Sequence, residues 1–110
     1  MRIDKVNELI KQELSKILLE EIEFNNGALV TILSVDTAKN LDSAKIWISV
    51  LPNGKTREVL NHLSKEIGNI QRILNRKLKM RFVPKISFKI DKSEEYADNI
   101  RKVFEEIGEE

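Results

Sequence analysis

The spacing of apolar residues changes along this chain, and this change constrains the fold more than any other feature. Between residues 2 and 21, apolar side chains recur every three or four positions, which predicts an amphipathic helix. Residues 28–37 are rich in β-branched side chains, as a mostly buried strand would be, and apolar residues occupy every second position from Ala44 to Val50. Because only a short turn around residues 39–42 separates these two predicted strands, we expect an antiparallel hairpin.

Helical spacing returns after Pro52, with a glycine in the middle of the helical region. Thr56 is placed to cap a helix that extends to Ile67, and the apolar spacing resumes after Gly68 and continues to Leu78. Glycine inside a helix costs about 1 kcal/mol relative to alanine. The pattern therefore predicts two helices that meet at a bend, with Asn69 as the cap of the second.

The last part of the chain adds a strand and a helix. Apolar and polar residues alternate over residues 86–90, after Pro84. Apolar residues from Tyr96 to Ile107 again have helical spacing. The predicted order is helix, strand, strand, helix, bend, helix, strand, helix, in a single domain over residues 1–110. Since each element has one apolar side, we expect a two-layer α+β sandwich with helices on one face of a three-stranded sheet. The pattern leaves open whether the third strand lies beside the first or the second.

The composition argues against catalysis. The chain has no cysteine and one histidine, which excludes a disulfide framework, a thiolate nucleophile and a Cys/His zinc site. His62 has no serine or cysteine in its periodic neighbourhood, so it is interpreted as a surface residue. The segment Asn53–Thr56 ends like a phosphate-binding loop, but Ser49 stands where that loop needs glycine, which favours a capped turn. We expect no enzymatic activity, no metal, no cofactor and no small-molecule substrate.

Hydropathy also argues against a membrane partner. The apolar runs are far shorter than the roughly twenty residues that span a bilayer, and the chain does not open like a signal peptide. A cytoplasmic protein is therefore expected.

The charge is distributed unevenly, although the net charge is only +1. Residues 1–64 carry 8 basic and 9 acidic side chains, residues 65–89 carry 8 and 1, and residues 90–110 carry 3 and 8. The middle block, at +7, is a candidate anion-binding surface. A solvated helix face is the alternative, but the near absence of acidic partners argues against it. The cations of interest are Arg72, Arg76, Lys77, Lys79, Arg81 and Lys85.

The spacing within this basic block suits a phosphate backbone. Arg72, Arg76 and Lys79 fall at i, i+4 and i+7, so they form one stripe if the helix extends that far. A bend at Gly68 would expose the amides of the following helix, beginning at Asn69, beside the stripe. Trp47 and Phe82 could stack on bases, although core packing is favoured for both.

Several segments, in their order and spacing, resemble the ribosome-binding factor A family. They include Val30-Thr31-Ile32, Ala44-Lys45-Ile46, Ile48-Ser49-Val50, Arg76-Lys77-Leu78-Lys79-Met80-Arg81 and Val83-Pro84. The resemblance implies a KH-like fold of type II, in which a helix-kink-helix replaces the usual loop. The kink of this family usually reads Ala-x-Gly, whereas this chain has Glu66-Ile67-Gly68.

The resemblance also implies a function. Such a factor binds the small (30S) ribosomal subunit and its 16S rRNA late in maturation, assists rRNA processing, matters in cold shock and catalyses no reaction. We expect a monomer when free, with RNA-binding residues Gly68, Asn69, Arg72, Arg76, Lys77, Lys79, Arg81 and Lys85. The alternative is a protein interaction module whose basic face meets an acidic partner.

Overall fold

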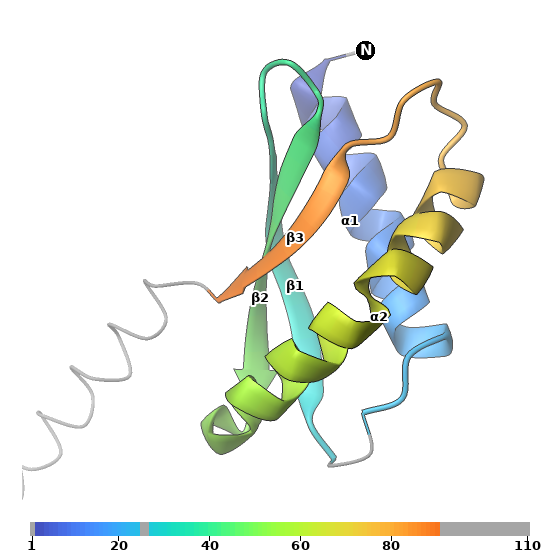
Figure 1. Ribbon diagram of the computed structural model, residues 1–110. Coiled ribbons are helices and arrows are strands. Elements are labelled where there is room, and N and C mark those ends of the chain that lie inside the picture. The colour runs from blue at the N-terminus through green and yellow to red at the C-terminus, as the bar shows by residue number, and fades with distance from the viewer. Residues whose placement is uncertain (1, 25–26, 91–110) are drawn as a thin grey trace, which may run out of the picture.

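The computed structural model describes residues 2–24 and 27–90, and Figure 1 shows their arrangement. The elements in chain order are α1 (Ile3–Glu20), β1 (Leu29–Thr37), β2 (Ser43–Leu51), the short 3₁₀ helix η1 (Asn53–Lys55), α2 (Thr56–Lys77) and β3 (Lys85–Ile90). The predicted α+β class with a three-stranded sheet is confirmed. The predicted last helix lies outside the described residues.

The sheet has the order β1-β2-β3. The strands β1 and β2 pair antiparallel, as predicted, and β3 pairs parallel to β2, with Ala44 opposite Ile86 and Ile46 opposite Phe88. Parallel neighbours need a long crossover connection, usually a helix, and α2 provides it. The third strand therefore lies beside the second, the position that the sequence pattern left open.

The strand β1 contains a bulge that changes which residues face the core. The pairing runs from Ile32 opposite Ile48 to Ser34 opposite Trp47, so Leu33 is an extra residue. Before the bulge Ile32 is buried, and after it the buried positions are Val35 and Thr37. The expectation of a mostly buried strand was wrong, because β1 is an edge strand with one face toward the helices.

One uninterrupted helix replaces the two that were predicted on either side of Gly68. The α2 helix runs from Thr56 to Lys77 and includes Gly68 in its interior. The apolar side chains on both sides of the glycine, including Leu63 and Ile70, are buried against one core. Tertiary packing of this apolar face outweighs the weak helix propensity of a single glycine.

The start of α2 also differs from the prediction. Thr56 is the first helical residue rather than its cap, and its hydroxyl donates a 2.8 Å hydrogen bond to the Asn53 carbonyl. The hydroxyl thus closes the 3₁₀ turn of η1 instead of accepting a bond from a helix amide. The segment is a turn, as expected, but the capping role of Thr56 was wrong.

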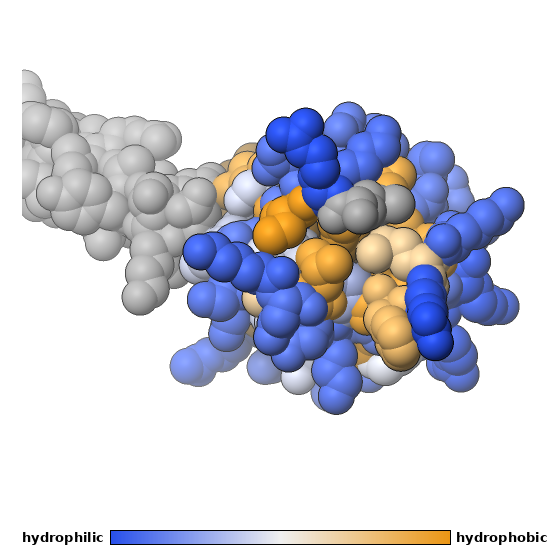
Figure 2. All heavy atoms as spheres, turned by 90° about the horizontal axis from the view of Figure 1, so that it is seen from above, coloured by the Kyte–Doolittle hydropathy of each residue, from blue (hydrophilic) through white to orange (hydrophobic). Residues whose placement is uncertain are grey.

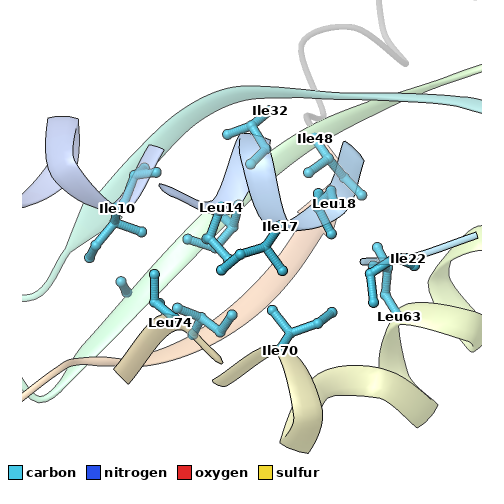
Figure 3. Packing of buried hydrophobic residues seen from close by; sticks show 14 of the residues in the cluster. Ile10, Leu14, Ile17, Leu18, Ile22, Ile32, Ile48, Leu63, Ile70 and Leu74 are labelled. Atoms are coloured by element: carbon cyan, nitrogen blue, oxygen red, sulfur yellow. The ribbon is translucent and has the colours of Figure 1, made fainter. Parts of the chain in front are cut away.

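The core lies between the two helices and one face of the sheet (Figures 1 and 3). Its fully buried members include Ile10 and Leu14 from α1, Ile46 and Ile48 from β2, and Leu74 from α2. Burying such a side chain contributes about 1.5–3 kcal/mol. These contacts hold α2 against the sheet. The face of α2 that points away from the core carries the charges described below.

An amide side chain from each helix is hydrogen-bonded to the outer edge of the sheet. Asn7 of α1 accepts a 3.0 Å hydrogen bond from the Thr37 amide of β1. Gln71 of α2 accepts a 2.9 Å bond from the Ile86 amide of β3 and donates a 3.1 Å bond to the Pro84 carbonyl. Edge strands leave backbone groups without a strand partner. Here the two helices satisfy some of them, which also sets the helices in register with the sheet.

Candidate nucleic-acid interface

The predicted cations come from three consecutive segments. Arg72, Arg76 and Lys77 lie in the last turns of α2, Lys79 and Arg81 in the loop that follows, and Lys85 at the start of β3. All six are exposed. We call these six residues the basic surface. Among the described residues, the ion pairs are Lys16–Glu13 and Lys55–Glu58, and neither includes a member of this surface. No acid within residues 2–24 and 27–90 therefore forms an ion pair with this surface, whose positive charge suits an anionic partner.

The helical stripe differs in extent from the prediction. Because α2 ends at Lys77, Lys79 lies beyond the helix, and the condition for a stripe that includes Lys79 is not met. The stripe extends in the other direction instead. Lys65 is exposed and stands seven residues before Arg72, which places it on the same helix face as Arg72 and Arg76. Lys65 is outside the predicted site, although the same spacing rule indicates it.

Gly68 lies on this exposed side of α2 but does not begin a helix. The amides of Gly68 and Asn69 are inside a continuous helix, so the predicted anion site on exposed helix amides was wrong. A Cβ built on Gly68 would meet no atom within 4 Å. The missing side chain therefore leaves a shallow depression on the helix surface, within one turn of Lys65 and Arg72.

Asn69 holds the side chain of Arg72. The Arg72 Nη2 donates a 3.0 Å hydrogen bond to Asn69 Oδ1, and Asn69 Nδ2 donates a 3.4 Å bond to Glu66 Oε2. Glu66 is the one acid among residues 65–89. Asn69 thus stands between this acid and Arg72, and its amide oxygen orients the guanidinium on the helix surface.

Three hydrogen bonds to the backbone place Lys85 and the loop before it. Gln71 bonds the backbone on both sides of Lys85, at Pro84 and Ile86, and the Lys85 amide donates a 3.1 Å bond to the Asp42 carbonyl. The loop of residues 78–84 is therefore held between α2 and the turn that joins β1 to β2. Gln71 is a positioning residue outside the predicted site, since nothing in its spacing distinguishes it from other polar helix residues.

The aromatic residues do not all lie where the sequence suggested. Phe82 is 75% exposed, so the expectation of core packing was wrong for this residue. The Arg81 guanidinium carbon lies 5.5 Å from the centroid of the Phe82 ring. Trp47 is half-buried on β2, whose buried positions alternate with it. His62 is half-buried rather than on the surface, with its ring 5.7 Å from that of Phe24 in an edge-on arrangement.

Other kinds of site find little support in the described part of the chain. Residues 2–24 and 27–90 contain no group of three or more His, Cys, Asp or Glu side chains that could hold a metal ion. None of the helices in these ranges combines the length and the hydropathy that crossing a membrane requires.

Comparison with known protein families identifies the family of this chain. The family model of ribosome-binding factor A matches residues 2–104. The chain belongs to this family. Ribosome-binding factor A of Caldanaerobacter subterraneus is 32% identical to it over 99% of this chain and 91% of the relative. The Natranaerobius thermophilus member is 34% identical over 98% and 83%.

Solved structures of ribosome-binding factor A have the same KH-like fold. The crystal structure of the Thermus thermophilus protein matches with a TM-score of 0.68 at 19% identity, over 82% of this chain and 97% of that one. A homology model of a Thermus thermophilus protein, fitted into a cryo-EM map of its complex with 30S, matches with a TM-score of 0.59 at 17% identity, over 82% and 91%. The resemblance deduced from the sequence is confirmed.

Proposed function

We propose that this protein is a non-catalytic ribosome biogenesis factor of the cytoplasm. It binds the small (30S) ribosomal subunit and its 16S rRNA during late maturation, and it assists rRNA processing and cold adaptation. Membership of the ribosome-binding factor A family over residues 2–104 is the observation that carries this proposal. The complex with 30S that is described for a Thermus thermophilus relative supports the choice of subunit.

The basic surface supplies the physical reason for RNA binding. Its six cations, together with Lys65, are exposed on α2, the following loop and the start of β3. Contacts of this kind neutralise phosphates and position a protein without reading base sequence. Gly68 lets the RNA backbone approach α2 closely, and Asn69 presents the Arg72 guanidinium. Specificity then comes from the shape of the rRNA.

Sedimentation of the tagged protein through a gradient of cell extract tests the choice of partner. We expect it to migrate with free small subunits and not with complete ribosomes. A protein that stays at the top of the gradient at low and moderate salt, while it binds an acidic protein, would contradict the proposal and favour an interaction module.

Charge reversal tests the surface. The double variant Arg72→Glu/Arg76→Glu should lose binding to small subunits while it keeps its circular dichroism spectrum, because both side chains are exposed. The matched control is Lys5→Glu/Arg57→Glu, which changes the net charge equally at two exposed cations outside the basic surface. Equal loss in both variants would mean that net charge, and not this surface, governs binding.

Salt dependence measures how many phosphates are contacted. For about five contacts, a plot of log affinity against log salt concentration should have a slope of roughly −3.5 to −4.5. The slope of the double variant should be less negative, by the amount that about two phosphate contacts contribute.

A further inference from the structure

A hollow lies at the end of the molecule where the β1–β2 turn meets the loop after α2. Its volume is about 630 Å³, which is within the usual range of roughly 300–1,000 Å³ for ligand pockets. Figure 2 looks onto this end of the molecule and shows apolar surface among hydrophilic side chains. The lining residues are Asn40, Leu41, Asp42, Lys79, Met80, Arg81, Phe82 and Val83.

The apolar part of this hollow has a fixed floor and an exposed aromatic ring. Leu41, Met80 and Val83 are partly buried and pack against the core, so the core supports this part of the hollow. Phe82 stands out from this floor and exposes 75% of its area. A flat π-surface beside an apolar floor fits the face of an unpaired nucleobase, which stacks on aromatic side chains in RNA-binding proteins.

The charges around the hollow favour a nucleotide over an apolar protein segment. Lys79 and Arg81 line it, and both are exposed. Arg81 lies 5.5 Å from the Phe82 ring centroid, where it stabilises the ring by a cation–π contact and stays within reach of a phosphate. These two cations belong to the basic surface, so an RNA strand that follows α2 passes the mouth of the hollow.

Polar groups on the opposite wall could contact the edge of a base. Asn40 Oδ1 accepts a 3.2 Å hydrogen bond from the Asp42 amide, which holds the turn in shape. The Asp42 carbonyl accepts a 3.1 Å hydrogen bond from the Lys85 amide, and this bond connects the turn to β3. The exposed Asp42 carboxylate can accept a hydrogen bond from the exocyclic amine of adenine, cytosine or guanine.

We propose that this hollow binds one unpaired nucleotide of the RNA. The base stacks on Phe82 over the apolar floor, Lys79 and Arg81 hold the flanking phosphates, and Asp42 favours a base that carries an exocyclic amine. This inference rests on the proposed function and adds to it, because it assigns recognition of single-stranded RNA to a site beyond the end of α2.

The test compares two RNA probes, a short single-stranded oligoadenylate and a blunt-ended RNA duplex, by fluorescence polarisation. Base–aromatic stacking is worth roughly 1–3 kcal/mol, so Phe82→Ala should weaken oligoadenylate binding by about 5- to 150-fold. Binding of the duplex should stay within about twofold, and Phe82→Tyr should bind oligoadenylate like the wild type. The matched control is Leu19→Ala, at a large apolar residue that is 83% exposed on α1.

The possible outcomes separate this proposal from the proposed function. If the wild type binds both RNAs and Phe82→Ala binds them unchanged, the nucleotide site is refuted and the proposed function stands. Equal losses for the two probes would also refute it, because the site would then not prefer unpaired RNA. If the wild-type protein binds neither RNA nor the small subunit, the proposed function itself fails.

Discussion

The uninterrupted course of α2 through Gly68 predicts that a Gly68→Ala substitution stabilises the protein. Alanine is favoured over glycine in a helix interior by about 1 kcal/mol. The new methyl group would meet no atom within 4 Å, and Gly68 is exposed, so neither a clash nor new burial alters this value. The free energy of unfolding should therefore rise by about 1 kcal/mol, and the melting temperature by about 4 °C.

Urea unfolding, followed by circular dichroism and by the fluorescence of Trp47, measures this change. With a slope of about 1–2 kcal/mol/M, the midpoint should move up by about 0.5–1 M. Gly27→Ala is the matched control, because Gly27 has φ +73° and nothing within 4 Å of an added Cβ. The same chemical change there should lower stability by about 1–2 kcal/mol, since the left-handed conformation disfavours a side chain. If Gly68→Ala were also destabilising, the chain would be broken at Gly68 and the two-helix prediction would be right.

Four other substitutions, one of them a control, test the contacts around the basic surface and the core beneath it. Gln71→Leu should cost about 1–3 kcal/mol of stability in urea unfolding, because it leaves backbone groups at both ends of its bridge to β3 without a partner. Asn75→Ala, which removes only an exposed acceptor for Gln71, should stay within about 0.5 kcal/mol, and equal effects would contradict the bridging role. Leu74→Ala should cost about 2–5 kcal/mol by opening a cavity in the core, and a smaller loss in thermal unfolding would mean looser packing than described. Asn69→Ala should leave stability nearly unchanged but weaken RNA binding about two- to tenfold in a filter-binding assay, because Arg72 must then be ordered on binding. Unchanged RNA affinity would show that Asn69 does not position Arg72 for the RNA.

The sequence by itself determined where most of the helices and strands lie and where the positive charge gathers. Apolar periodicity is a local property, so α1, β2 and the helical character of residues 56–77 follow from neighbouring residues. The hairpin follows from the short turn between its strands. The basic surface follows from a count of charges, and the segments that resemble ribosome-binding factor A indicate the family through their order and spacing alone.

The tertiary structure decided the features that depend on residues far apart in the chain. The bulge at Leu33 and the continuity of α2 at Gly68 result from packing against a shared core, which local propensity does not report. The position of β3 beside β2, and the hydrogen bonds of Asn7 and Gln71 to the sheet edges, join residues that only the completed fold brings together. The hollow beside Phe82 has the same origin. Its walls come from residues 40–42 and 79–83, and no spacing rule links those two segments until α2 has carried the chain back to the sheet.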